Sequence, residues 1–421
     1  MSAKWSRRSG SATLRARIRP GRLAWVGLAT VPALWLVTAP TAATVVVNAN
    51  PDLAIRLWPW NADAQAIKAG TLITIGASSA QLDRARGHAW KALAREPVNI
   101  PAVRAIALSE DMQHRPGAAG RLFAYAEELS RRDLATQLWM IEALVAKGDI
   151  DGTLIHYDRA LRTRKEAEPL LLPILVSAMA TPETRAPIGR LLATRPQWWP
   201  RYVEQALADP STIDTLPLIF ARLRVSPMDE QGRGFLSTGI ASLIRAGRFS
   251  EALTVYRTAM SATTKEQALL RDGSFERDPL LPPFDWQLAD GDVVSALIQA
   301  RPGGSRALFA VPTEGAQGEF ARQLLTLPAG RYRLSYRVGS LPADGIHMAL
   351  KLQCVADSTL RDVAMHPFAP APDTGRTGMV DFAIPAGGCT AQWLILSIDN
   401  PGAVPENPPW LDDLRIEALS S

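Results

Sequence analysis

Small and aromatic residues that recur every 34 positions constrain this chain more than any other feature. In each copy a small residue is followed four positions later by a second alanine or an aromatic residue, and three positions after that by alanine. Steps of four and three place these positions on one face of an α-helix. A fixed period of this length indicates stacked helical hairpins. The positions are Ala85, Ala89 and Ala92; Ala119, Phe123 and Ala126; Thr153, Tyr157 and Ala160; and, at the same internal offsets, Ala252, Tyr256 and Ala259.

This pattern resembles the tetratricopeptide repeat. In that family the second helix needs a small residue where it crosses the first helix, an aromatic residue toward the next hairpin and an alanine for close packing. Pro97 stands where the repeat usually ends, and Gly148 stands at the turn between the two helices. The family's signature glycine is replaced by Ala107 and Ile141, so the repeats are degenerate. The resemblance implies a solenoid over residues 48–265.

Residues 165–232 lack a clean period and contain several prolines, so we interpret them as divergent hairpins, with unrelated helical packing as the alternative. In tetratricopeptide proteins the first helix of each repeat builds a concave face that binds a partner. The resemblance therefore implies a protein-binding surface made by six positions of two first helices. The alternative is that these positions are only solvated or are covered by a neighbouring helix. They are Arg104, Leu108, Asp111, Leu138, Glu142 and Val145.

Residues 148–164, "GDIDGTLIHYDRALRTR", contain chemistry-bearing side chains but do not predict catalysis. His156 and Asp158 are two positions apart, so on a helix they point roughly 200° away from each other and form no dyad. The chain also lacks a G-x-S-x-G nucleophile motif, a Walker A loop and an H-E-x-x-H motif. We therefore expect no catalytic residues and no enzymatic activity.

Positive charge is concentrated at the N-terminus. The net charge is +5, but residues 1–22 contain seven Lys and Arg and no acidic residue, which leaves −2 for the remainder. A body without excess positive charge excludes a nucleic-acid partner. Residues 23–47 are uncharged and long enough to span a bilayer. We expect a transmembrane signal anchor there, a cytoplasmic tail over 1–22 and a periplasmic bulk on the bacterial inner membrane; the alternative is a cleaved signal peptide.

Residues 266–421 predict an antiparallel β-sandwich. Short β-type runs are separated by turn residues, and residues 331–338 alternate between polar and apolar side chains. "GSFE", "FDW" and "WLDDLRI" resemble the galactose-binding-like jelly rolls, which include many carbohydrate-binding modules. That resemblance implies a structural calcium held by Glu276 and by Asp412 or Asp413. Trp410 and Trp286 are candidates for stacking on sugar, with closure of the sandwich base as the alternative for Trp286, whereas Trp393 is expected in the core.

Cys354 and Cys389 are the only cysteines. In an exported chain an intradomain disulfide is their simplest use, with two separate buried thiols as the alternative. No histidine lies at ligand spacing for zinc.

The chain is thus expected to be a multidomain α-then-β protein: a transmembrane helix, a tetratricopeptide-like α-solenoid and a jelly roll. This build resembles bacterial repeat proteins associated with cell-envelope or exopolysaccharide assembly or export. The resemblance implies a non-enzymatic scaffold that binds a protein partner, with no cofactor; polysaccharide contact through the β domain and a structural calcium stay open. The alternatives are a glycan-binding module on a helical spacer and an unrecognised carbohydrate-active enzyme.

Overall fold

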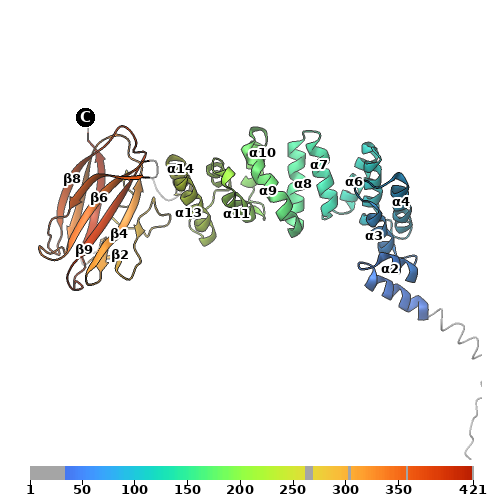
Figure 1. The fold of residues 1–421 in the computed structure, drawn as a ribbon, viewed down its shortest axis with the longest axis horizontal. Coiled ribbons are helices and arrows are strands. Elements are labelled where there is room, and N and C mark those ends of the chain that lie inside the picture. The colour runs from blue at the N-terminus through green and yellow to red at the C-terminus, as the bar shows by residue number, and fades with distance from the viewer. Residues whose placement is uncertain (1–33, 261–268, 302–304, 357–358, 420–421) are drawn as a thin grey trace, which may run out of the picture. The chain divides into compact units, whose positions relative to one another are not determined.

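The computed structural model describes residues 34–260, 269–301, 305–356 and 359–419 (Figure 1). The chain divides into two compact units, Met1–Arg164 and Lys165–Ser421. In the first unit the described residues are helical. The second unit contains further helices and then all the described strands.

The first unit consists of short helices that pack in sequential pairs. Helix α3 packs against α4, α5 against α6, and α7 against α8. Polar residues cap most of their N-termini, as Ser78 does for α4 through a capping box with Gln81. Gly148, with φ +72°, provides the left-handed turn between α7 and α8. After a helix over residues 34–46, the elements are α2 (Pro51–Leu57), α3 (Ala62–Leu72), α4 (Ser79–Leu93), α5 (Ile100–Met112), α6 (Pro116–Leu129), α7 (Leu134–Val145) and α8 (Ile150–Thr163).

The periodic positions form the packing faces of these helices. All nine residues of the first three copies are buried. Phe123 of α6 stacks on Trp139 of α7, with ring centroids 4.1 Å apart, as expected for an aromatic residue directed at the next hairpin. In the fourth copy Ala252 and Tyr256 are buried and Ala259 is half-buried. The prediction of a helical region is therefore confirmed.

The predicted single-pass membrane helix over residues 23–47 is contradicted. Residues 1–33 lie outside the described residues, and among the described ones no helix combines the length and apolar character that a bilayer crossing requires. Ala43 and Val47 instead pack in a cluster with Ala54 of α2 and Ala64 of α3. The prediction of a single-pass inner-membrane protein was therefore wrong for the part of the run that the structure describes.

The helices of the second unit are shorter and less regular. Proline lies inside two of them, at Pro173 in α9 and Pro187 in α10. A proline inside a helix removes a backbone donor, which accounts for the broken sequence period here. The elements are η1 (Lys165–Ala167), α9 (Glu168–Ser177), η2 (Ala178–Ala180), α10 (Pro182–Ala193), α11 (Trp199–Ala208), η3 (Pro210–Thr212), α12 (Leu216–Leu223), α13 (Glu230–Arg245) and α14 (Phe249–Met260).

The strands form two five-stranded antiparallel sheets, so the predicted β-sandwich is confirmed (Figure 1). The sheet orders are β1-β4-β9-β6-β7 and β2-β3-β10-β5-β8. Phe320, Leu334 and Leu396 lie in the apolar core that the sheets enclose. The strands are β1 (Gln287–Leu288), β2 (Val294–Ala300), β3 (Arg306–Pro312), β4 (Ala316–Leu325), β5 (Gly330–Gly339), β6 (His347–Ala356), β7 (Thr359–Pro367), β8 (Arg376–Ile384), β9 (Ala391–Asn400) and β10 (Trp410–Ala418).

The predicted disulfide is confirmed. Cys354 of β6 and Cys389, just before β9, are bonded with their Cα atoms 5.1 Å apart. Both residues are buried. The side chain of Gln392 donates to the Cys389 carbonyl and accepts from the backbone N–H of Leu327, so the bridge lies in a hydrogen-bonded corner of the sandwich. The alternative of two separate thiols is excluded.

Candidate functional site

The outer face of the β2-β3-β10-β5-β8 sheet brings aromatic and charged side chains together. Along β5, Tyr332, Leu334, Tyr336 and Val338 point into the core, so the alternate residues, including Arg337, point outward. Paired residues of antiparallel strands share a face. In the strand register Trp410 lies opposite Phe309 of β3 and Gly339 of β5, and Asp412 lies opposite Arg337. The register therefore places Trp410, Asp412 and Arg337 on the outer face.

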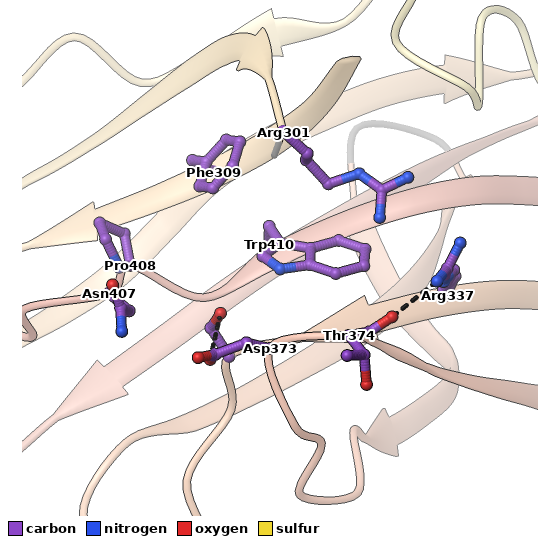
Figure 2. Close-up of a pocket in the computed structure, with 9 residues that line it drawn as sticks. Arg301, Phe309, Arg337, Asp373, Thr374, Asn407, Pro408 and Trp410 are labelled. Carbon is purple, nitrogen blue, oxygen red and sulfur yellow. Dashed lines mark hydrogen bonds between the residues drawn. The ribbon is translucent and has the colours of Figure 1, made fainter. Parts of the chain in front are cut away.

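This face contains a pocket of about 510 Å³ (Figure 2). Its size lies within the roughly 300–1,000 Å³ range of small-molecule sites. Strands supply its floor, whereas the loops before β8 and β10 supply much of its polar rim. The lining residues are Arg301, Phe309, Arg337, Ser340, Asp373, Thr374, Asn407, Pro408 and Trp410.

Two glycines give the Trp410 indole its place. A Cβ at Gly339 would lie 2.2 Å from Cε2 of the ring, and a Cβ at Gly375 would lie 2.6 Å from Cη2. Gly375 also has φ +86°, a backbone conformation that other residues rarely adopt. The indole thus packs directly against backbone at both positions and is only 3% exposed.

The guanidinium of Arg301 covers the indole. Its Cζ lies 4.2 Å from the ring centroid, a cation–π distance, and its Nη2 donates to Oδ2 of Asp412 over 2.7 Å. Burial raises the pKa of the Asp412 carboxyl, and the adjacent negative charge of Asp413 acts in the same direction, while Arg301 opposes the rise. The Nε–H of Arg301 is buried without a hydrogen-bond acceptor. The guanidinium therefore retains unused donor capacity.

The rim is polar and hydrogen-bonded. Arg337 donates through Nη2 to the Thr374 carbonyl over 2.6 Å, and the Ser340 hydroxyl donates to Oδ1 of Asp373 over 2.9 Å. Figure 2 shows Arg301 and Arg337 toward the benzo end of the indole and Asn407 toward the opposite end. The pocket thus offers cationic donors at one end and an amide at the other, with the Asp373 carboxylate on the rim.

The predicted sugar-stacking residues lie in different surroundings. Trp410 lines the pocket, but Arg301 covers its ring, so the indole forms a wall instead of an open platform. Trp286 is 1% exposed, packs against Phe275 and donates from Nε1 to the Asp272 carbonyl, so it leaves no face for a ligand. Trp393, expected in the core, is half-buried on β9 beneath Arg322, whose Cζ lies 4.7 Å from its ring centroid.

The carboxylates proposed for calcium are largely engaged by groups of the protein itself. Both oxygens of Asp412 are used, Oδ2 by Arg301 and Oδ1 by the backbone N–H of Asp413. Asp413 is exposed, and Oε1 of Glu276 accepts from the backbone N–H of Arg306. Within the described residues no group of three or more His, Cys, Asp or Glu side chains is placed to hold a metal ion. A guanidinium occupies the position beside Asp412 that a cation would need.

The positions proposed for the concave face lie on α5 and α7. Arg104 forms an ion pair with Asp133, Leu108 packs against the cluster around Phe123, and Asp111 is half-buried. On α7, Leu138 is half-buried, whereas Glu142 and Val145 are exposed. Their role in binding a partner stays a prediction.

His156 and Asp158 contact different residues. His156 is buried, and its Nδ1 lies 2.7 Å from Oε1 of Gln137 on α7. Asp158 forms an ion pair with Arg162 one turn along the helix. Each side chain therefore has a structural contact of its own, and the two form no dyad.

Sequence reasoning missed most of the pocket. The alternation in β5 places Arg337 outside the core, but it does not reveal that β10 is the neighbouring strand. Arg301, Asp373 and Asn407 are loop residues without a local pattern. Only the pairing of strands far apart in the sequence brings them to Trp410.

No protein-family model matches this chain, and no curated protein matches it. Solved structures match over about a third of its length. A family 61 carbohydrate-binding module in complex with β-1,4-galactotriose has 17% identity and a TM-score of 0.28, covering 37% of this chain and 100% of the module. A putative sugar-binding protein from Bacteroides thetaiotaomicron has 12% identity and a TM-score of 0.30, covering 36% and 100%. The xylan-binding CBM22-1 domain of Paenibacillus barcinonensis Xyn10C has 14% identity and a TM-score of 0.26, covering 35% and 93%. The C-terminal β-sandwich resembles these modules, and no residue role is carried over from them.

Proposed function

We propose that the β-sandwich binds carbohydrate in the pocket beside Trp410 and that the chain acts by binding, without catalysis. The observation that supports this proposal is the composition of the pocket. One indole and one phenyl ring lie among two guanidinium groups, a carboxylate, an amide and two hydroxyls. A sugar fits the polar part of this lining, because its hydroxyls both donate and accept hydrogen bonds, while the packed rings hold the floor of the pocket in place.

The geometry favours a saccharide over a purely apolar ligand. Asp373 and Asn407 are exposed on the rim, where they can exchange water for hydroxyl groups at low desolvation cost. Trp410 and Phe309 are packed and held by the strands, so the apolar part of the pocket is preformed. A pocket that is preformed at its floor and adaptable at its rim suits a segment of a polysaccharide chain.

The test is binding of neutral and acidic oligosaccharides to the full chain, first on a glycan array and then by calorimetry. We expect saturable binding that the rim variants Asp373→Ala and Asn407→Ala each weaken about tenfold, which corresponds to about 1.4 kcal/mol. These residues are exposed, so their loss leaves the core intact.

Trp410→Ala should abolish binding, and Trp393→Ala is its matched control. Both indoles lie beneath an arginine in the same sandwich, but Trp393 is on the other sheet. Because Trp410 is buried, each variant is first checked by circular dichroism and thermal unfolding. The proposal fails if no saccharide binds, or if the rim variants and a folded Trp410→Ala bind as well as the parent protein.

We also propose that the hairpins from α3 to α8 are tetratricopeptide-like and serve as a protein-binding scaffold. The 34-residue register of buried small and aromatic positions, and the contact of Phe123 with the next hairpin, support this proposal. Substituting exposed Val145 and Glu142 should then reduce recovery of a defined partner without changing saccharide binding. Equal recovery by this variant and the parent protein would contradict the scaffold role.

A further inference from the structure

Two guanidinium groups lie beside a single indole in the pocket. Cζ of Arg301 is 4.2 Å and Cζ of Arg337 is 5.7 Å from the centroid of the Trp410 ring. Two cations this close to one ring repel each other unless anions compensate them. The acidic groups around each arginine therefore indicate whether the pocket can accept an anionic ligand.

Only one of the two cations has an acidic partner. Arg301 pairs with Asp412, which is itself buried. Across the described ranges Arg337 forms no ion pair; its one side-chain hydrogen bond goes from Nη2 to the neutral Thr374 carbonyl. Asp373 is the carboxylate among the lining residues, and it accepts from Ser340. Asp412 lies opposite Arg337 in the strand register, but its Oδ2 is bound by Arg301. Arg337 is thus a half-buried guanidinium without a direct ion-pair partner among the described residues.

Arg337 retains hydrogen-bond donors that an acid group can use. Arginine presents its N–H groups as a planar fork that matches a carboxylate, and such charge-assisted bonds are stronger than neutral ones. Nη1 and Nε of Arg337 make no hydrogen bond within the described part of the chain, and Nε of Arg301 is a buried donor without an acceptor. A neutral sugar hydroxyl can satisfy one donor, but it brings no negative charge to Arg337.

We propose that the pocket takes an acidic saccharide whose carboxylate binds Arg337 at the benzo end of Trp410, while its hydroxyls face Asp373 and Asn407. This inference rests on the proposed carbohydrate-binding function and narrows it to uronic acids and other carboxylated sugars. The carboxylate supplies Arg337 with a direct ion-pair partner, while Arg301 stays paired with Asp412 over the Trp410 ring. The indole then bounds the rest of the sugar unit, and the polar rim forms hydrogen bonds with it.

The experiment compares each acidic oligosaccharide with its own carboxyl-reduced form, using calorimetry on the full chain. Oligogalacturonate and oligoguluronate are suitable probes, and dextran sulfate tests whether any anionic polymer suffices. We expect the acidic form to bind at least tenfold more tightly than the reduced form. Raising the salt concentration should narrow that difference, because part of it is electrostatic.

Variants at Arg337 separate the effect of its positive charge from the effect of its planar set of N–H donors. Arg337→Gln should weaken binding of the acidic form about tenfold more than binding of the reduced form, whereas Arg337→Lys should keep only part of the preference for the acidic form. Arg333→Gln is the matched control, because Arg333 lies on the outer face of the same strand but pairs with Asp381 over 2.7 Å. It should change neither affinity.

Each result decides between the two proposals. Equal binding of the acidic and reduced forms, or equal loss of both in Arg337→Gln, overturns the acidic preference and leaves carbohydrate binding in place. Tighter binding of dextran sulfate than of any carboxylated probe overturns the carboxylate assignment. Absence of binding to every saccharide overturns the proposed function itself.

Discussion

At the scale of single residues, Gly339 decides where Trp410 can lie. Gly339→Ala would place a methyl group 2.2 Å from the indole, so the ring must shift. We expect the free energy of unfolding to fall by about 1–3 kcal/mol, as in other overpacked sites, and saccharide affinity to fall with it. Chemical denaturation and calorimetry measure the two effects.

Gly318→Ala on β4 is the control for this substitution. Its Cβ would meet Val294 at 3.6 Å, an ordinary contact. Equal effects of the two alanines on stability and affinity would show that the indole can shift freely.

His156 should make stability depend on pH. Burial lowers the pKa of this imidazole below its usual value of 6.5, with the positive charge of Arg159 acting in the same direction and Glu127 opposing it. Because the folded pKa is lower than the unfolded one, the full contribution is present above about pH 6.5 and is lost as the pH falls through the folded pKa. The unfolding free energy should therefore decrease on acidification, and His156→Gln should flatten that slope.

His88 has the same relationship to Gln65, with Nδ1 and Oε1 2.6 Å apart, and burial lowers its pKa too. A second substitution, His88→Gln, should therefore remove more of the pH dependence in urea unfolding between pH 7.5 and 5. An unchanged slope in the double variant would mean that other groups control acid sensitivity. The sequence placed His156 on a repeat helix. It could not show Gln137 beside it, because that contact joins residues 19 positions apart on two different helices.

At the scale of elements, the disulfide joins β6 to the segment that enters β9. It closes a loop with a sequence separation of 35. Constraint of the unfolded chain over that length is worth roughly 2–4 kcal/mol. The Cys354→Ala, Cys389→Ala double variant should lose about this much unfolding free energy, as measured by denaturant titration. The parent protein should show the same loss after reduction, and insensitivity to reductant would contradict it.

Elements with a strong local pattern were predictable and the others were not. The 34-residue period and the alternation along β5 arise from contacts repeated within one element, so the sequence carries them directly. Strands β2 and β7 lack such a pattern: "VSALIQA" has an apolar character without clear alternation, and "TLRDVAMHP" is an edge strand with Leu360 and Met365 exposed. The apolar run before α2 led to a membrane prediction that rested on length and lack of charge alone, and among the described residues no helix is both long and apolar enough to cross a bilayer.

At the scale of the whole molecule, two compact units imply two unfolding events. The disulfide lies in the second unit and His156 in the first. In a thermal scan of the full chain, removal of the disulfide should lower one transition temperature, and acidification should lower the other through His156 and His88. A single transition that responds to both changes would show that the units unfold cooperatively.

The pocket's floor and rim come from different kinds of structure. Trp410, Phe309 and Arg337 belong to paired strands, whereas Asp373, Thr374 and Asn407 belong to loops. Substitutions in these loops leave the strand ladder and the core unchanged, so they can accumulate without loss of folding. If the pocket binds sugars as proposed, related chains selected for different sugars should vary in these loops while keeping Arg337 and Trp410 on the strands. The sandwich would then serve as a fixed frame on which ligand preference evolves.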